Sequence, residues 1–313
     1  MAQELKVVVP THNRVDLLRR TLDSLAGCRL PAIYSGTIVV ENSPRQLAHD
    51  IVEACPETLR ARYLYVSRPN KSHALNEALA EVPDETLIYF IDDDIRLSTN
   101  VLDNYAKAAE GIDGGVFFGG PFRVDCEQDP PQWLLKYLPD SARGWEPAPE
   151  EIDPASTYYI GFNWAAFAGD IRRAGGFDTR FGPGGTTGGA GQETNMQQRL
   201  YLAGVRSCYV PGAWVWHYVP AQRCTPSWAI QRWHRTSITD GLARPVNEGG
   251  GLLFGVPRHK YRKLLRYWWR YAVARFHRDE EKSFQARFEL TRFSGLLKGM
   301  RKAYRERHLT SQQ

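Results

Sequence analysis

The sequence predicts an α/β fold, with a mainly parallel central sheet, helices on both faces and a basic α-helical C-terminal region. In the first half, short apolar runs alternate with segments of helical periodicity, the pattern of a parallel sheet. Residues 256–313 hold 16 Lys and Arg against 5 Asp and Glu, whereas residues 1–255 hold 24 against 30. We therefore expect a mildly acidic body and a strongly basic tail. The predicted domains are residues 1–241 and a basic helical region, residues 242–313.

The elements of the first half follow in order along the chain. Apolar runs predict strands, and leucine and alanine at helical spacing predict the helices between them. The predicted strands are Leu5–Val9, Thr37–Val40, Tyr63–Val66, Leu87–Ile91 and Val116–Gly119. The predicted helices are Val15–Ala26, Pro44–Ala54, Ser72–Ala80 and Asn100–Ala109.

The second half is less regular. Cys126–Pro154 is rich in proline and tryptophan and predicts an elaborated loop, and glycine-rich Phe181–Gly191 predicts a mobile lid or a simple linker. The further predicted strands are Tyr158–Phe162, Cys208–Val210 and Trp214–Val219, and the further predicted helices are Glu193–Ala203, His259–Phe276 and Phe284–Tyr304.

Composition excludes several classes of protein. The 313 residues are 42% hydrophobic and 24% charged, which is ordinary for a soluble globular chain. The apolar runs fall far short of the roughly 20 residues that span a bilayer, and the N-terminus has no signal-peptide pattern. The five cysteines are scattered without CxxC spacing, which predicts neither a zinc site nor a disulfide framework. We therefore expect a cytoplasmic protein.

Three adjacent carboxylates, Asp92, Asp93 and Asp94, follow the apolar run Leu87–Ile91. The carboxyl ends of parallel strands form the crevice where open α/β sheets bind ligands. Adjacent carboxylates repel one another unless a cation or donors compensate, and oxygen ligands favour Mg²⁺ or Mn²⁺. The sequence therefore predicts a metal site holding a diphosphate; the alternative is a solvated acidic turn.

Four segments resemble the inverting GT-A glycosyltransferases of family 2, which transfer a sugar from a nucleotide-sugar donor. Each motif is weak alone, but their order and spacing are specific, and the resemblance runs from about Lys6 to about Gly241. The segments are Val9–Arg14, similar to PTYNR; Pro69–Asn76, similar to N-x-G-x-A-x-N with Ser72 in place of glycine; Asp92–Asp94, similar to the DxD motif; and Gly161–Asn195, similar to G-x-N, GGFD and GED.

The resemblance implies a donor nucleotide site, which we expect to take a UDP-sugar. Pro10, Thr11 and Arg14 would line the crevice for the base and ribose, and Glu41 would accept from the uracil N–H or a ribose hydroxyl. The remaining donor contacts would come from Lys71, Asp92 and Asp93. For Arg14 and Lys71, a solvated surface charge is an equal alternative.

The resemblance also implies a Mn²⁺ or Mg²⁺ site. Asp94 would contact the metal directly, and Asp92 would contact the ribose or a metal-bound water. His217, in a V-x-H segment, would complete the site, although a packed core histidine is as good an interpretation. The metal would neutralise charge on the departing diphosphate.

Glu193 is the predicted general base, because it stands at the acidic second position of the GED segment, which here reads Gly191-Gln192-Glu193. Inversion needs one carboxylate to take the proton of the acceptor hydroxyl. Gln192 departs from the family pattern, and the alternative is that Glu193 only caps its helix. The predicted acceptor or sugar contacts are Trp133, Trp164, Asn163, Gln192 and Arg223; for the aromatics, core packing is the alternative.

In the tail, Trp268 and Trp269 stand among Arg262, Lys263, Arg266 and Arg270. Tryptophan favours the membrane interface and cations favour anionic headgroups, so we expect peripheral contact with the inner face of the plasma membrane. Packing on the body or a homodimer interface is the alternative, and nucleic-acid binding is disfavoured because no recognised binding module accompanies the charge.

The function expected is transfer of a hexose-type sugar to a hydroxyl of a glycan or lipid-linked acceptor. Two alternatives remain. A non-catalytic module that binds sugar nucleotides or a membrane surface would fit the departure at Gln192. A nucleotidyltransferase would share the acidic site, but it should have a glycine-rich basic loop where Pro10–Arg14 stands.

Overall fold

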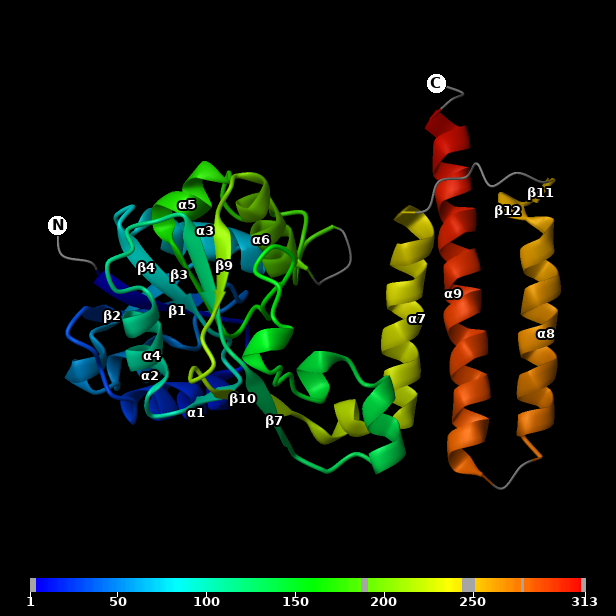
Figure 1. Cartoon of the computed structure of the whole chain (residues 1–313), viewed down its shortest axis with the longest axis horizontal. Coiled ribbons are helices and arrows are strands. Elements are labelled where there is room, and N and C mark those ends of the chain that lie inside the picture. The colour runs from blue at the N-terminus through cyan, green and yellow to red at the C-terminus, as the bar shows by residue number, and fades with distance from the viewer. Residues whose placement is uncertain (1–3, 187–190, 244–250, 277–278, 311–313) are drawn as a thin grey trace. The chain divides into compact units, whose positions relative to one another are not determined.

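The computed structural model describes residues 4–186, 191–243, 251–276 and 279–310. Its main sheet is built from β1 Glu4–Thr11, β2 Tyr34–Glu41, β3 Ala61–Tyr65, β4 Thr86–Phe90, β6 Val116–Gly119, β8 Trp164–Phe167 and β9 Arg206–Tyr209. In the described residues the strand order is β3-β2-β1-β4-β8-β6-β9. The pairs β1–β2, β2–β3, β1–β4 and β6–β9 are parallel, and β8 is antiparallel to β4 and β6. The predicted, mainly parallel α/β sheet is therefore confirmed (Figure 1).

Helices cover both faces of this sheet. Their bounds are α1 Val15–Ala26, α2 His49–Glu53, α3 Lys71–Ala80, α4 Val101–Ala108, α5 Ala168–Arg173 and α6 Gln192–Leu202. Successive strand side chains point to opposite faces, so Val7 and Val9 of β1 pack in one core layer and Val8 in the other. The first layer includes buried residues of α1, α2 and α4, and the second those of α3, α5 and α6.

Two predicted elements are wrong in part. Tyr158–Phe162 is not a strand, because the backbone of Tyr159 bonds the side-chain amide of Gln197, at 2.7 Å for its N–H and 3.0 Å for its carbonyl. The strand of this region is β8. The helix predicted from Pro44 begins only at His49, because the Glu41 carboxylate accepts hydrogen bonds from the backbone N–H groups of residues 47 and 48.

A small second sheet extends the strand-end edge. It consists of β5 Ile95–Leu97, β10 Val215–Val219 and β7 Phe122–Cys126, in that order. β10 is antiparallel to β5, with His217 opposite Ile95. This pairing brings a residue more than 100 positions along the chain to the end of the Asp92–Asp94 turn.

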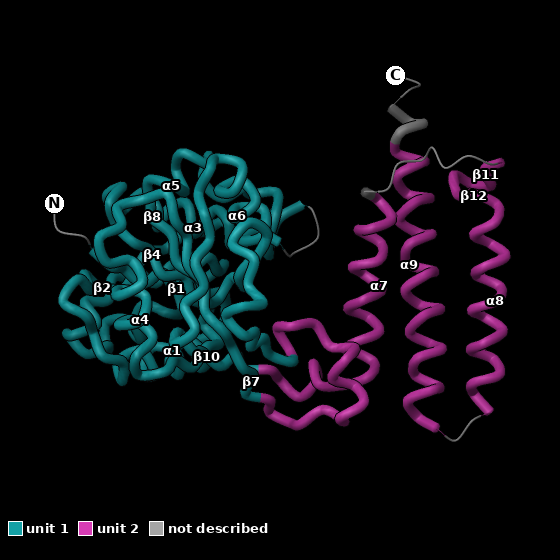
Figure 2. Tube along the Cα trace, in the orientation of Figure 1, with its two compact units in different colours: residues 1–125, 143–218 teal, residues 126–142, 219–313 magenta. Residues whose placement is uncertain are grey.

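The described residues divide into two compact units (Figure 2). The first is Met1–Asp125 with Arg143–Tyr218, and the second is Cys126–Ala142 with Val219–Gln313. The boundary expected after residue 241 remains a prediction about domains. Short 3-10 helices complete the structure at Glu57–Leu59, Gln132–Tyr137, Asp140–Ala142, Pro149–Glu151 and Ala221–Cys224.

The second unit is built on three helices, α7 Pro226–Ala243, α8 Arg258–Ala274 and α9 Glu280–Thr310, with a hairpin of β11 Leu252–Leu253 and β12 Val256–Pro257 before α8. Glycines let α7 and α9 approach closely, since a Cβ on Gly241 would lie 2.2 Å from a carbonyl oxygen of α9. None of the helices described has the length and hydropathy needed to cross a membrane.

Candidate functional site

The three carboxylates lie at the carboxyl ends of the parallel strands. β4 ends at Phe90, and the turn Asp92–Asp94 follows before β5 begins. Because β1 runs parallel to β4, its end lies beside this turn, and the Thr11 hydroxyl donates to Asp93 Oδ2 at 2.7 Å. Asp93 and Asp94 are buried, with exposed fractions of 4% and 7%.

Two cations compensate the carboxylates. The Nη1 of Arg14 lies 2.8 Å from Asp94 Oδ2 and 3.2 Å from Asp93 Oδ1. The Lys71 ammonium forms an ion pair with Asp92. Both cations are therefore paired with the acids. The Lys71 side chain is only 14% exposed, whereas that of Arg14 is 40% exposed and remains partly solvated.

The environment separates the pKa values of the two buried acids. Burial and the neighbouring Asp94 raise the pKa of Asp93 to about 6, against the lowering effect of Arg14 and Thr11. Burial also acts to raise the pKa of Asp94, but His217, Arg14 and Lys71 outweigh it, so that this pKa is lowered. As the pH falls, Asp93 therefore takes up a proton before Asp94 does, and near pH 7 both carboxyls are mainly anionic.

Asp94 and His217 offer an oxygen and a nitrogen to a cation. Asp94 Oδ1 is buried and has no hydrogen-bond partner in the described structure, and it lies 3.6 Å from His217 Nε2. The His217 ring is stacked on Phe162 at 4.6 Å, which fixes its plane. No group of three or more His, Cys, Asp or Glu side chains among the described residues could hold a metal ion alone. The pair fits a cation that takes its other ligands from a bound diphosphate and water, as Mg²⁺ usually does.

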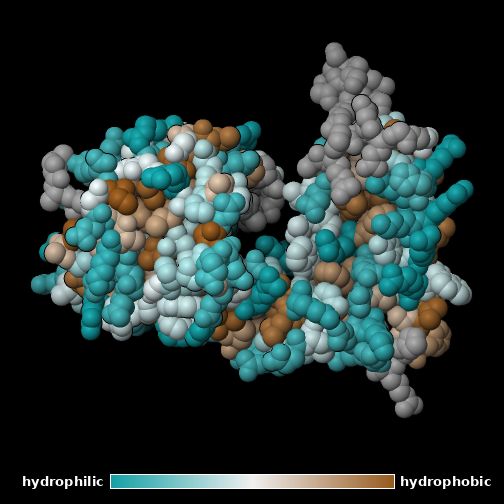
Figure 3. All heavy atoms as spheres, viewed as in Figure 1, coloured by the Kyte–Doolittle hydropathy of each residue, from teal (hydrophilic) through white to brown (hydrophobic). Residues whose placement is uncertain are grey.

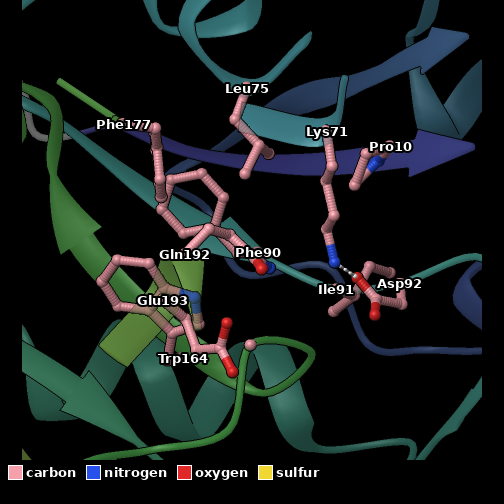
Figure 4. Close-up of a pocket in the computed structure, with 11 residues that line it drawn as sticks. Pro10, Lys71, Leu75, Phe90, Ile91, Asp92, Trp164, Phe177, Gln192 and Glu193 are labelled. Carbon is pink, nitrogen blue, oxygen red and sulfur yellow. Dashed lines mark hydrogen bonds and ion pairs between the residues drawn. The ribbon is translucent and has the colours of Figure 1, made fainter. Parts of the chain in front are cut away.

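A narrow pocket adjoins the acidic turn and brings together residues from six separate segments (Figure 4). It is lined by Pro10, Lys71, Leu75, Phe90, Ile91, Asp92, Gly161, Trp164, Phe177, Gln192 and Glu193. In Figure 4, Lys71 reaches toward Asp92, and the Glu193 side chain lies beside the Trp164 ring. The predicted base and the predicted donor-binding acid thus line the same pocket.

Glu193 is positioned by Gly161. It is the second residue of α6, which begins after Gly191 in a left-handed conformation at φ 88°. A Cβ at Gly161 would lie 3.2 Å from the Glu193 Cδ, tighter than most such contacts. The absence of a side chain at Gly161 therefore leaves the space that the Glu193 carboxylate occupies.

The first part of the glycine-rich loop is held against the start of α3. Asn70 Nδ2 donates to the carbonyl of Thr179 at 2.8 Å, and the Ser72 hydroxyl donates to that of Phe181 at 2.9 Å. A Cβ at Gly184, where φ is +81°, would lie 1.8 Å from the Pro69 carbonyl oxygen. The loop through residue 186 is therefore packed and hydrogen-bonded rather than free, and residues 187–190 of the predicted lid lie outside the described residues.

Several predicted site residues make other contacts. Glu41, 1% exposed, accepts from Tyr63 at 2.6 Å as well as from the loop before α2. Asn163 is fully buried, and its side chain bonds the hydroxyls of Tyr89 and Tyr105 and two backbone carbonyls. The contacts of Glu41 and Asn163 in this structure are thus with other parts of the protein, and they stabilise the local fold.

The predicted sugar contacts also differ in their surroundings. Gln192 and Trp164 line the pocket, but Trp164 is only 1% exposed and stacks on Phe90 at 4.7 Å. Trp133 and Arg223 belong to the second unit, where the Trp133 ring packs on Phe284 at 5.0 Å.

Sequence reasoning missed the apolar wall of the pocket, formed by Leu75, Phe90 and Phe177. Asn76 fixes this wall, because its amide exchanges hydrogen bonds of 2.8 and 2.7 Å with the backbone of Phe177. Asn76 and Phe177 both stand in segments that carry the family resemblance, so the sequence marked the two residues. The sequence did not indicate that these two segments are in contact.

Comparisons with known proteins agree with this geometry. The model of the family described as Glycosyl transferase family 2 matches residues 6–174. No curated protein matches the chain in sequence. The fold is similar to that of a mannosyltransferase, PcManGT from Pyrobaculum calidifontis, solved with GDP-Man and Mn²⁺; the TM-score is 0.57 and the identity 17%, over 96% of this chain and 87% of that one. It is also similar to residues 1–349 of S. aureus TarS, with a TM-score of 0.50 and 13% identity over 97% and 91%.

At these identities the solved structures show the GT-A fold, and the family match carries the assignment. That match covers more than half of the 313 residues and includes most of β1, the acidic turn and Gly161. The chain therefore belongs to glycosyl transferase family 2 and is a glycosyltransferase.

Proposed function

We propose that this glycosyltransferase moves a sugar from a nucleoside-diphosphate sugar, a UDP-sugar in our assignment, to a hydroxyl of a glycan or lipid-linked acceptor, with inversion and with Mn²⁺ or Mg²⁺. The observation that carries the proposal is the pocket shared by Glu193 and the acidic turn. Direct displacement needs a base on the acceptor side and charge compensation on the leaving-group side. The pocket has a carboxylate from α6, and at the end of β4 a carboxylate, Asp92, that is paired with Lys71 of α3.

On the donor side, Pro10, Thr11 and Arg14 would line the nucleotide crevice, and Asp92 and Asp93 would lie along the ribose and diphosphate. Arg14 already spans Asp93 and Asp94, so a diphosphate arriving there would meet a positioned guanidinium. Lys71 would contribute a second positive charge. At the end of β2, Glu41 would accept from uracil or ribose. Its oxygens already accept from three donors within the protein.

A divalent cation held by Asp94 and His217 would stabilise the negative charge that develops on the leaving diphosphate. Asp92 would bind the ribose or a water of that site. The mannosyltransferase of similar fold is described with GDP-Man and Mn²⁺. It supports a metal-dependent donor site, and it makes guanosine the principal competitor to the uridine that we propose.

On the acceptor side, Glu193 would take the proton of the attacking hydroxyl. Burial acts to lower the pKa of Lys71, but the charge and hydrogen bond of Asp92, with added contributions from Glu193 and Asp94, outweigh it, so the lysine pKa is raised and the side chain stays a cation. Gln192, next to the base and 6% exposed, would orient the acceptor or the transferred sugar. Trp164 would add an apolar surface at the pocket floor.

The test begins with nucleotide binding. Melting temperature would be measured with UDP, GDP, CDP and dTDP, each with Mn²⁺ or with EDTA. We expect UDP with Mn²⁺ to give the largest increase and Asp94→Ala to abolish the part that needs metal. A larger increase with GDP would move the donor to GDP-mannose or a related sugar, and no increase with any nucleotide would overturn the donor site.

Glu193→Gln separates catalysis from binding. The variant should keep the nucleotide-dependent increase in melting temperature and lose at least about 100-fold in donor turnover, the scale of general-base removal. Turnover would be followed by release of the nucleoside diphosphate. Equal turnover in Glu193→Gln and wild type would overturn the role of Glu193 and leave the donor site standing.

A further inference from the structure

The helix α8 presents an apolar ridge to solvent. Trp268 and Trp269 are 57% and 66% exposed, Leu265 is 67% exposed, and Phe276, just after the helix, is 92% exposed. At 3.6 residues per turn Leu265, Trp268, Trp269 and Val273 fall on one side of α8, and these four residues with Phe276 form the ridge. Side chains of this size rarely stand in water together unless they form a binding surface. Figure 3 shows hydrophobic surface among hydrophilic side chains in the region of α8.

The opposite side of α8 packs against α9. The ring of Tyr267 packs on Phe293 at 5.3 Å, and Arg270 forms an ion pair with Glu289 at 2.9 Å. Ala274 is 7% exposed on the same side. These contacts fix the orientation of α8 within its unit. The ridge stays exposed to solvent, and Trp269 and Val273 at its edge line an open groove shared with the start of α9.

The charge of α8 identifies the kind of partner. Its 17 residues contain six Lys and Arg and no Asp or Glu. Arg262 and Arg266 stand on the helix beside the ridge and are exposed. An apolar ridge with cations along its flank and tryptophans near its middle is the arrangement of a helix that lies in the interface of an anionic bilayer. A second copy of the chain would oppose this cationic surface with an identical one.

The hairpin before α8 adds a second, independent observation. Phe254 stands at its tip with φ 51° and is 70% exposed, and its neighbours Leu252 and Leu253 are also exposed. A bulky residue in the left-handed region is strained, and such outliers gather at functional sites. The Arg301 guanidinium lies 6.0 Å from the centroid of the Phe254 ring, but most of this strained residue stays in water, and insertion into a bilayer would bury it.

We infer that α8 and the β11–β12 hairpin form a binding surface for an anionic phospholipid bilayer, with the ridge inserted among the acyl chains and the flanking cations on the headgroups. With this surface bound to a bilayer, the proposed transfer reaction would take place at the membrane. Lipid binding needs neither donor nor acceptor, so it can be tested apart from the donor site, and either can fail without the other.

The experiment is sedimentation of the full chain with sucrose-loaded vesicles of phosphatidylcholine alone or with about one third phosphatidylglycerol. We expect at least tenfold stronger partitioning onto the anionic vesicles, weakened as NaCl rises from 0.05 to about 0.5 M because exposed charges are screened. No sedimentation with anionic vesicles at low salt would overturn the inference.

Variants locate the surface. Trp268→Ser with Trp269→Ser, Phe276→Ser alone, and Arg262→Glu with Arg266→Glu should each lose about tenfold or more of the anionic-vesicle partitioning. Leu202→Ser, which changes an 81% exposed residue at the end of α6, is the matched control and should bind as wild type does. Melting temperature and nucleotide-induced stabilisation confirm that each variant is folded, and the single Phe276 change lies outside α8.

Two results would assign the ridge elsewhere. Unchanged partitioning in all ridge variants would show that other residues bind the vesicles. A dimer by light scattering that becomes a monomer in the Trp268 and Trp269 variant, without vesicle binding by wild type, would make the ridge an interface between copies of the chain.

Discussion

At the residue scale, Gly161 is the least conspicuous part of the site and one of the most constrained. It lies before β8, at the pocket wall opposite the start of α6. The space left by its missing side chain is filled by Glu193. Catalysis by a positioned base depends on placement to within a fraction of an ångström, so this contact should affect rate more than stability.

Gly161→Ala tests this dependence. The new Cβ would press on the Glu193 side chain, which can move, so we expect a loss of about tenfold or more in turnover with little change in melting temperature. Steady-state release of nucleoside diphosphate, with KM and kcat separated, is the measurement. Gly27→Ala is the matched control, because its nearest neighbours would lie 3.5 Å away. Equal turnover in the two variants would contradict the positioning role.

Asn163 illustrates the opposite case, a motif residue whose visible contacts are structural. Its amide satisfies two buried tyrosine hydroxyls and two backbone carbonyls near the centre of the first unit. A buried amide with its partners in place stabilises a unique arrangement, and losing it would leave several unsatisfied groups. In the G-x-N segment, Gly161 therefore leaves room for the Glu193 side chain, and Asn163 fixes the start of β8 through its hydrogen bonds.

At the element scale, the start of α3 holds the segment 179–185 in place. The Ser72 hydroxyl, the Asn70 amide and the backbone N–H of Lys71 all donate to carbonyls of that segment. The same turn of α3 places Lys71 at Asp92. The N-terminus of α3 thus both binds the segment 179–185 and places the Lys71 cation at the acidic turn.

Ser72→Ala should loosen this hold without disturbing the helix. Removing the donor leaves the Phe181 carbonyl unsatisfied, which we expect to lower local stability by about 1 kcal/mol. Trypsin should then cleave after Arg180 roughly fivefold faster than in wild type, as followed by mass spectrometry. Ser294→Ala, which removes a bond within α9, is the control and should leave this cleavage unchanged.

At the scale of the whole molecule, the core under the parallel sheet contains groups that ionise only at high pH. Burial raises the pKa of the Cys28 thiol to about 12 and that of the Tyr34 hydroxyl to about 12. In the unfolded chain these groups ionise near about 8.5 and 10. Their contribution to stability is complete below those values and is lost as the pH rises toward 12.

The free energy of unfolding should therefore fall above about pH 8.5. The share due to Cys28 is about 2 kcal/mol between pH 8.5 and 10, at 1.4 kcal/mol per unit. Urea unfolding of wild type and Cys28→Ala at several pH values, with reductant, would measure it. Cys28→Ala is expected to start less stable and to lose less across this range. Parallel curves for the two proteins would contradict the assignment.

The sequence by itself determined the parallel sheet, the place of the acidic turn and most of the helices, because these depend on short-range periodicity and on the fixed relation between a strand and its carboxyl end. It also carried the motifs of the family. Two sequence predictions were wrong: the strand of β8 was placed too early, and α2 was started too early, at Pro44. Both outcomes depend on side chains that bond distant backbone, Gln197 at Tyr159 and Glu41 at the loop before α2.

Only the tertiary structure decided which residues meet. Gly161 beside Glu193, Asn76 on Phe177 and His217 at Asp94 join segments from 32 to more than 100 positions apart, and no local pattern encodes such pairs. The same is true of α8, whose sequence is basic and aromatic on several sides. Packing against α9 decided which of its aromatics are half-buried and which face solvent, because a helix has many faces and only a neighbour selects one.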